Sequence, residues 1–276
     1  MRQLANERSK GEELDREDVS LDFESDTDST TASITSSILQ YRMIHGRTYH
    51  SEQRNAQYWG SSDEQKKDMM DLTRHHILTL GLGDKLHLAP LKYGNIQQAI
   101  DIGTSTGIWA MWLMGSIGNW DAFFTETFRL CEPGGWAESH EASSDISSDD
   151  GTVASDSSMG HWGKLFIKGR KQIGTAFKVV EDSTQRKAME KAGFINIQEF
   201  DFRSPIEKQM GMHTQHGLET DSEGFVLFMA HTVSWNREEI DGYTAQFRRE
   251  VQPGKQHGYF AQKVVWGQRP EIGDTE

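Results

Sequence analysis

A short apolar stretch near the middle of the chain runs into a loop of glycine and hydroxyl residues. Residues 98–102 read Gln-Ala-Ile-Asp-Ile and predict a short buried strand, and the next five read Gly103-Thr-Ser-Thr-Gly107. An apolar helix start follows at Ile108. A strand, a glycine loop and a helix in this order form a cradle for a ligand, because backbone N–H groups at the helix N-terminus are free to bind polar or anionic atoms.

The same loop also fits a Gly-x-Ser-x-Gly nucleophile elbow, in which Ser105 would attack a carbonyl carbon. Such a hydrolase needs a buried histidine and an acid as well, and no pair of this kind stands out in the sequence. We therefore favour the ligand-cradling interpretation of the loop.

Two histidines, His213 and His216, have the H-x-x-H spacing of metal ligands. They lie in a segment rich in Gly, Met and Gln that we expect to be a loop, and no third ligand or catalytic glutamate accompanies them, so we predict no metal site. Cys131 is the single cysteine, which excludes an internal disulfide and indicates a reducing compartment. We expect its thiol to pack at a helix end rather than to act as a nucleophile.

The composition excludes further classes of protein. The chain has 276 residues and a formal net charge of −13, so bulk charge does not favour nucleic-acid binding. The longest apolar run, Ile108 to Met114, is far shorter than the roughly 20 residues of a membrane span, and the acidic N-terminus does not resemble a secretory signal. We expect a cytoplasmic or nuclear protein that binds neither membranes nor nucleic acids.

The elements that must position the loop follow from apolar spacing and capping residues. A helix is expected from the capping box Ser62 and Gln65 to Gly81. Beyond the loop, strands alternate with helices, which indicates an α/β fold. The expected elements are a helix at 119–130, a strand at 136–141, helices at about 160–176 and 183–192, a strand at 194–202 with a bulge at 198–199, an apolar segment at 225–233, a helix from Asn236, and a strand at 259–266.

Seven segments, in this order along the chain, resemble the fungal LaeA-like branch of class I S-adenosylmethionine (SAM) dependent methyltransferases. They are Tyr41-Arg42 with Gly46-Arg-Thr-Tyr-His50, Lys85-Leu-His-Leu-Ala-Pro90, Asp101-Ile-Gly-Thr-Ser-Thr-Gly-Ile-Trp-Ala110, Gly115-Ser-Ile117 with Trp120, Pro133-Gly-Gly-Trp136 with Glu138, Ser148-Asp-Asp-Gly-Thr152, and Ala192-Gly-Phe194. The resemblance implies an α/β fold: a reduced Rossmann-like class I methyltransferase sheet with a helical N-terminal extension. It divides the chain into a disordered acidic Ser/Thr-rich tail (1–36), a helical lid or extension (37–97), a truncated methyltransferase-like domain (98–270) and a short tail (271–276).

The resemblance also implies the residues of a binding site. SAM would be held by the loop residues Asp101, Gly103, Thr104, Ser105 and Gly107. Tyr49 and His50 would contact substrate or cofactor from a lid, although the alternative that their segment is a structural clasp stays open. Glu138 is the nearest candidate for a contact with substrate, and no catalytic residue can be named, because methyl transfer needs little beyond positioning.

A part of the family pattern is missing after the glycine loop. Met111 to Met114 connects Ala110 directly to Gly115, where the family has three further strands, one of which ends in the carboxylate that grips the ribose. About fifty residues are absent by this comparison. Ser105 also replaces the middle glycine of the family loop. We therefore expect SAM binding to be weak or absent unless another chain completes the site.

These inferences predict a LaeA-like methyltransferase-family protein of fungal secondary metabolism, with SAM-dependent methyl transfer impaired. Its partner would be a natural-product intermediate or a pathway protein. The alternative hypothesis is a non-catalytic scaffold or regulator, and a third is a gene model that lost an exon near Trp112. Because the shortened sheet should leave apolar surface uncovered, we also expect a homo-oligomer or a stable partner.

Overall fold

The computed structural model describes residues 41–50, 59–61, 77–92, 94, 96–102, 115–206 and 208–273. All of them belong to the unit Gln40–Glu276, one of the two units into which the chain divides. The predicted tail at 1–36 lies outside the described residues. So does most of the helix predicted from Ser62, of which residues 77–81 are described and helical.

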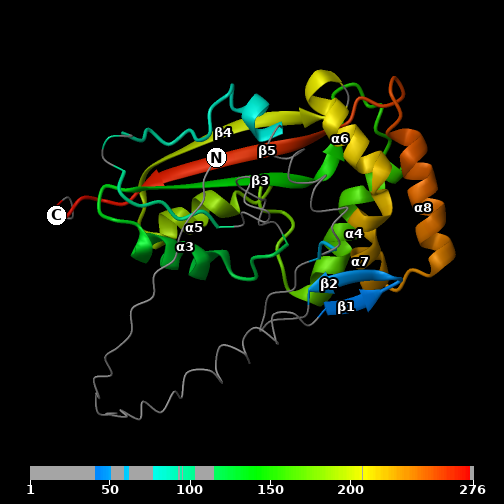
Figure 1. Cartoon of the computed structure of the whole chain (residues 1–276), viewed down its shortest axis with the longest axis horizontal. Coiled ribbons are helices and arrows are strands. Elements are labelled where there is room, and N and C mark those ends of the chain that lie inside the picture. Colours follow the sequence, from blue (N-terminus) through cyan, green and yellow to red (C-terminus); the bar gives the residue numbers. More distant parts are fainter. Residues whose placement is uncertain are drawn as a thin grey trace, which may run out of the picture. The chain divides into compact units, whose positions relative to one another are not determined.

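The main sheet has three strands, β3 (Trp136–Ser147), β4 (Ile195–Pro205) and β5 (Tyr259–Gln268). Strand β5 lies in the centre and is antiparallel to both neighbours, which gives the order β3-β5-β4 (Figure 1). All three strands were predicted from the sequence, and β4 was predicted from its alternation of apolar and polar residues. The bulge expected at 198–199 lies slightly earlier in β4, because the register shifts between Ile195 and Gln198 while residues 198 and 199 pair regularly with β5.

Helices connect these strands, so the predicted α/β class is confirmed. The helices with complete descriptions are α3 (Trp120–Leu130), α4 (Ser158–Ile173), α5 (Thr184–Ala192), α6 (Lys208–Thr220), α7 (Ser222–Thr232) and α8 (Arg237–Glu250).

Local capping explains where several helices start and stop. Asn119 accepts a hydrogen bond from the N–H of Ala122 at the start of α3, and Asn236 with Glu239 forms the expected capping box of α8. Gly193 ends α5 with a φ of 101°, a left-handed conformation that glycine adopts without strain.

The strand predicted at 98–102 is not formed. Residues 96–102 are exposed coil, with Ile100 70% and Ile102 46% exposed. Apolar β-branched residues form a strand when a neighbouring strand pairs with them, and none of the described strands lies in register with this segment. The prediction was wrong because sequence pattern alone does not supply that neighbour.

A β-hairpin stands where a helical extension was expected. Strands β1 (Tyr41–Ile44) and β2 (Arg47–His50) pair antiparallel through a two-residue turn at His45 and Gly46. Both turn residues have positive φ, 47° and 82°, as a type I′ turn requires. The helical expectation for this part of the chain was therefore wrong.

The segment expected to be a Gly/Met/Gln loop around His213 is helix α6. It packs against β4, and this tertiary contact outweighs the low helix propensity of its two glycines, Gly211 and Gly217. His213 and His216 thus lie three positions apart on a helix rather than in a loop.

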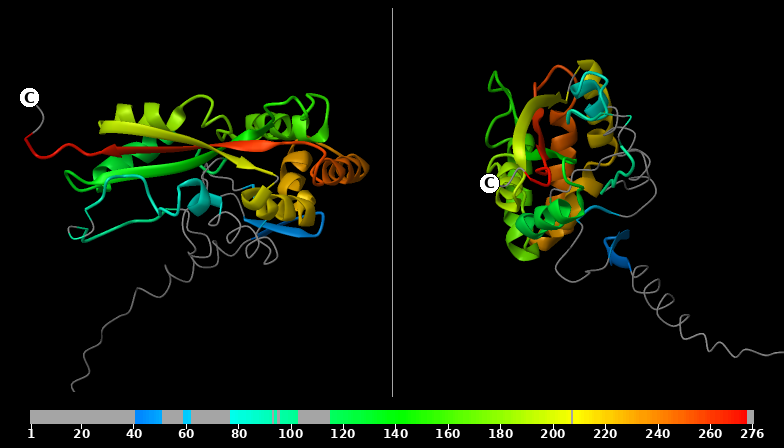
Figure 2. Two further views of the ribbon diagram at one scale, coloured as in Figure 1. Left: turned by 90° about the horizontal axis from the view of Figure 1, so that it is seen from above. Right: turned by 90° about the vertical axis from the view of Figure 1, so that its left-hand side faces the viewer.

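The two faces of the main sheet carry different partners. On one face, Ala137 and Val265 pack against α3 and α5. On the other, Val264 and Trp266 pack against Leu82 and Ala89, and we call this side the Trp266 face. Figure 2 (left) shows α5 and the segment Ile77–Leu91 on opposite sides of the sheet. A third cluster of buried apolar residues joins α4, α7 and α8.

Candidate functional site

The glycine loop expected to hold SAM is largely outside the described residues. Gly103, Thr104, Ser105 and Gly107 cannot be placed, and Asp101 is exposed at the end of the coil at 96–102. A glycine loop presents its N–H groups to a ligand when a strand in a sheet anchors its start, and that strand is not formed here. The described residues therefore do not assemble a SAM site.

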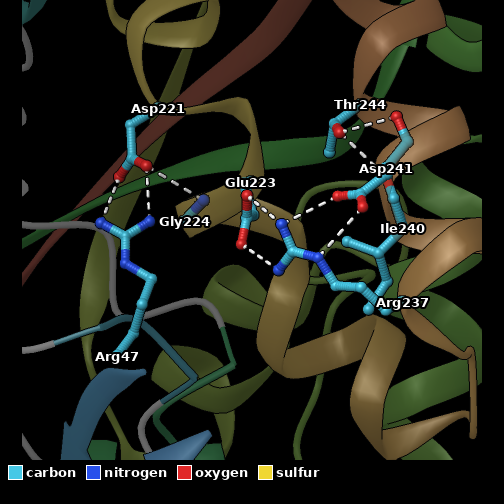
Figure 3. Close-up of polar contacts among 8 residues, drawn as sticks. All are labelled: Arg47, Asp221, Glu223, Gly224, Arg237, Ile240, Asp241 and Thr244. Atoms are coloured by element: carbon cyan, nitrogen blue, oxygen red, sulfur yellow. Dashed lines mark hydrogen bonds and ion pairs between the residues drawn. The ribbon is translucent and has the colours of Figure 1, made fainter. Parts of the chain in front are cut away.

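The β1–β2 hairpin is fastened to helix α7. The side chain of Tyr49 is fully buried, and its ring centroid lies 5.5 Å from that of Phe228. Arg47 donates two hydrogen bonds to the carboxylate of Asp221, at 2.5 and 3.0 Å, and Asp221 also accepts from the N–H of Gly224 at the start of α7 (Figure 3). These contacts favour the structural clasp over the lid, whereas the side chain of His50 lies outside the described part of the chain.

A second arginine nearby, Arg237, also binds carboxylates through its guanidinium group, but it lies closer to solvent. Arg237 pairs with Glu223 and Asp241, but its side chain is 46% exposed, whereas those of Arg47 and Asp221 are 17% and 9% exposed (Figure 3). Water and salt screen the exposed pairs, so they contribute little to stability. The Arg47 pair is the one that matters for holding the hairpin.

Glu138 holds the Lys85–Pro90 loop against the sheet. Its carboxylate accepts hydrogen bonds from the backbone N–H of Leu88 at 2.8 Å and of Ala89 at 2.6 Å. His140, two residues further along β3 on the same face, lies 2.5 Å from it through Nε2. Two segments that carry the family resemblance, Lys85–Pro90 and Pro133–Glu138, thus contact each other through this carboxylate.

These contacts determine the protonation of Glu138. Burial raises its pKa, but the hydrogen bond from His140 and those from Ala89 and Leu88 together outweigh burial, so the pKa lies below its ordinary value. The carboxylate is ionised at neutral pH and its acceptor sites are occupied. In this structure Glu138 positions a loop, and its expected contact with a substrate stays a prediction.

His140 was missed by the sequence reasoning. Its side chain is 8% exposed, and its second ring nitrogen, Nδ1, is buried without a hydrogen-bond partner in the described part of the chain. The signal was present, since a histidine two residues from a strand glutamate must share its face of the sheet.

The motif Ser148–Thr152 folds into a turn that is stabilised by hydrogen bonds between its own residues. Asp150 accepts hydrogen bonds from the N–H and hydroxyl of Thr152, and its other oxygen lies 2.5 Å from Nδ1 of His257. The hydroxyl of Thr152 in turn accepts from the N–H of His257 at 2.9 Å. This turn joins the end of β3 to the loop that precedes β5, and it gives the family motif a structural role.

Cys131 has the properties of a packing residue. It is half-buried at the C-terminal end of α3, and burial raises the pKa of its thiol. A raised pKa leaves less of the reactive thiolate at neutral pH. The expectation of a packing role is in accord with this environment.

The described residues contain neither a cluster of three or more metal-ligating side chains nor a membrane span. No three His, Cys, Asp or Glu side chains among them lie close enough to hold a metal ion. None of the described helices is long and apolar enough to cross a membrane.

Comparison with curated proteins finds fungal relatives, whereas no family model matches the sequence. Methyltransferase pytC of Aspergillus terreus is 26% identical over 325 aligned positions, which cover 95% of this chain and 99% of pytC. The probable methyltransferase tdiE of Emericella nidulans is 26% identical over 53% of this chain and 49% of tdiE. The secondary metabolism regulator LAE1 of Cochliobolus heterostrophus is 23% identical over 83% of this chain and 95% of LAE1.

Solved structures give a fainter likeness. Phosphoethanolamine N-methyltransferase 2 of Haemonchus contortus, in complex with S-adenosyl-L-methionine, matches at 17% identity with a TM-score of 0.29. The match covers 55% of this chain and 30% of that one, so the chain spans less than a third of the solved protein.

The chain is thus similar, over most of its length, to a curated fungal methyltransferase and to a regulator of secondary metabolism. This similarity supports the LaeA-like methyltransferase resemblance seen in the sequence.

Proposed function

We propose that this chain serves fungal secondary metabolism as a methyltransferase-family protein whose own SAM site is incomplete. SAM is the cofactor that the resemblance implies, and when bound it supplies an electrophilic methyl group. The chain's described residues contribute a positioned loop at Glu138 and a clasped hairpin at Arg47, but no carboxylate in place to grip a ribose.

The observation that carries this proposal is the exposed coil at 96–102. A bound nucleoside needs a rigid loop and walls around its rings, and an exposed coil provides neither. Ordering it on binding would cost about 1–2 kcal/mol per residue, which would consume most of the −8.2 kcal/mol of a micromolar site.

The alignment with pytC also supports a missing segment. It runs over 325 positions but covers 95% of the 276 residues of this chain, so roughly 60 positions of the alignment have no residue of this chain opposite them. A gap of about fifty residues between Ala110 and Gly115, as we propose, would account for most of these positions.

Titration calorimetry of the purified chain with SAM and with its demethylated product tests the proposal. We expect no binding tighter than about 100 µM, or −5.5 kcal/mol. Micromolar binding that is abolished in a folded Gly103→Asp variant would contradict it, because a working glycine loop would then be present. Sequencing the transcript across Trp112 separates a true deletion from a lost exon.

A non-catalytic scaffold or regulator is the second candidate, and the relationship to LAE1, a protein named as a regulator, favours it. A scaffold predicts that the Gly103→Asp variant, if folded, leaves the amount of pathway product unchanged in the host. An enzyme predicts that the same variant abolishes the product.

We further propose that the uncovered apolar surface supports self-association or a stable partner. Leu86, Ile96, Ile100 and Ile102 are all exposed within one short stretch of chain. Sedimentation at tens of micromolar should show an oligomer, or affinity purification from the host should recover a partner. A monodisperse monomer without a partner would contradict this expectation.

A further inference from the structure

Two exposed histidines lie next to each other where the β1–β2 hairpin contacts helix α7 (Figure 1). His45 occupies the turn of the hairpin, and His231 lies in the last turn of α7. Their ring centroids are 5.8 Å apart, and the ring planes meet at 82°. Neither ring makes a hydrogen bond or an ion pair with a residue that the structure describes. Two imidazole groups are therefore presented to solvent at one point of the surface.

Packing of the hairpin fixes the positions of these two side chains. Ile44, which precedes the turn, packs against the apolar cluster of α4, α7 and α8. The guanidinium group of Arg42 lies 5.2 Å from the ring centroid of Phe228. Phe228 precedes His231 by three residues, so both lie on the same face of α7. These contacts hold the backbone of His45 beside α7, while the two exposed rings can still rotate.

The turn itself does not explain why residue 45 is a histidine. A type I′ turn favours Asn, Asp or Gly at the positions with positive φ, and His45 has a φ of 47°. An uncommon residue in such a conformation points to a role for its side chain. His231, in turn, lies at the C-terminal end of a helix, where the helix dipole favours a positive charge. A bound cation would account for both observations.

Imidazole nitrogens are ligands for Zn²⁺, Cu²⁺ and Ni²⁺. With Zn–N bonds of about 2.0–2.1 Å, two imidazoles of one tetrahedral site have ring centroids about 5 Å apart, so rotation of the exposed rings brings one nitrogen of each onto a shared ion. A structural zinc ion takes four ligands. The described part of the chain holds no third His, Cys, Asp or Glu close enough to this pair. The two histidines are therefore half of a zinc site.

We propose that a zinc ion bridges two copies of this chain, with His45 and His231 of each copy as its four ligands. A two-fold axis through the ion presents the same pair of imidazoles twice, which completes a tetrahedral site. The surface beside the pair is open to a second copy, since Met43 is 65% exposed and a side chain added at Gly46 would meet no described atom within 4 Å. This goes beyond the proposed function and does not involve SAM, so SAM titrations and the following experiment fail independently.

Sedimentation velocity of the purified, untagged full chain tests the bridge. We expect added zinc sulfate to increase the dimer until one zinc ion is present per two chains, and EDTA to reverse this increase. An equal concentration of Mg²⁺ should have no effect, because Mg²⁺ prefers oxygen ligands. The association through apolar surface that we proposed above does not depend on zinc, so EDTA distinguishes the two. The same oligomeric state in zinc and in EDTA, or binding of one zinc ion per chain without dimerisation, would overturn the proposal.

His45→Asn and His231→Gln each remove one ligand per chain and leave the backbone unstrained. Asparagine is favoured in a type I′ turn, so the hairpin of the His45→Asn variant keeps its conformation. We expect each variant to weaken zinc-dependent dimerisation at least about tenfold, since two of the four ligands are lost. The matched control is His216→Gln, which replaces an exposed histidine on α6 and should leave dimerisation unchanged. If either variant dimerises with zinc as the wild type does, or if the control loses the dimer as well, the proposal is wrong.

Discussion

Replacing Glu138 with glutamine keeps the shape of the side chain and removes its charge. The carboxylate now accepts from Leu88, Ala89 and His140, and hydrogen bonds to a charged acceptor contribute about 1.5–3 kcal/mol against about 0.5–1.5 for neutral ones. A loss of about 1 kcal/mol at each contact gives about 2–3 kcal/mol for the variant. Glu138 is largely buried, so solvent screening removes little of this.

Urea denaturation followed by circular dichroism measures the free energy of unfolding. For a domain of this size, a loss of 2–3 kcal/mol lowers the thermal midpoint by roughly 5–10 °C. Amide hydrogen exchange at Leu88 and Ala89 should accelerate more than elsewhere, because the loop loses its anchor. The control is Glu126→Gln, which removes an exposed ion pair with Arg129 on α3 and should change stability by less than about 0.5 kcal/mol.

The reasoning also predicts the effect of pH. The pKa of Glu138 is lower in the folded chain than its ordinary value of about 4.3, so the ionised form stabilises the fold above that pH, and this contribution is lost as pH falls through the folded-state pKa. The gap between wild type and Glu138→Gln should be constant above about pH 5.5 and shrink in more acidic solution. Equal stability of the two proteins at pH 7, or a gap that widens in acid, would refute the argument.

Two further perturbations test the packing and the clasp. Gly163→Ala should destabilise the fold by about 1–3 kcal/mol, because a methyl group there would overlap Asp145. Gly242→Ala, in open space on α8, should stabilise the fold by about 0.5–1 kcal/mol. Thermal melts of both variants measure these changes. Arg47→Lys should cost about 1–2 kcal/mol in urea denaturation because lysine cannot make the two-bond fork, and Arg237→Lys less than about 0.5. A similar cost for the two lysine variants would show that burial of the fork is unimportant.

The parts of the fold that could be predicted depend on neighbours in sequence. The capping box of Asn236 and Glu239 and the glycine stop at Gly193 act within one helical turn, so their residue types indicate them directly. The alternation that predicted β4 was equally visible, because it needs only the residues of the strand itself.

The parts that could not be predicted depend on distant partners. Residues 98–102 have strand propensity, but whether they form a strand depends on a pairing segment that the sequence pattern does not specify. Glu138 looked like a free carboxylate because its donors, Leu88 and Ala89, precede it by about fifty residues. The hairpin turn used His45 at positive φ, a conformation that histidine adopts only occasionally and that pattern reasoning does not expect.

The strand order β3-β5-β4 has a consequence for how the chain folds as it is synthesised. Strands β3 and β4 do not touch each other, and the strand that joins them, β5, follows both in the sequence. Until β5 has left the ribosome, each of the other two has no partner in this sheet and presents unpaired backbone groups that another nascent chain can bind. Sheet formation therefore waits for the last strand, and a ribosome that stalls before Tyr259 would leave a nascent chain prone to aggregation rather than a smaller folded domain.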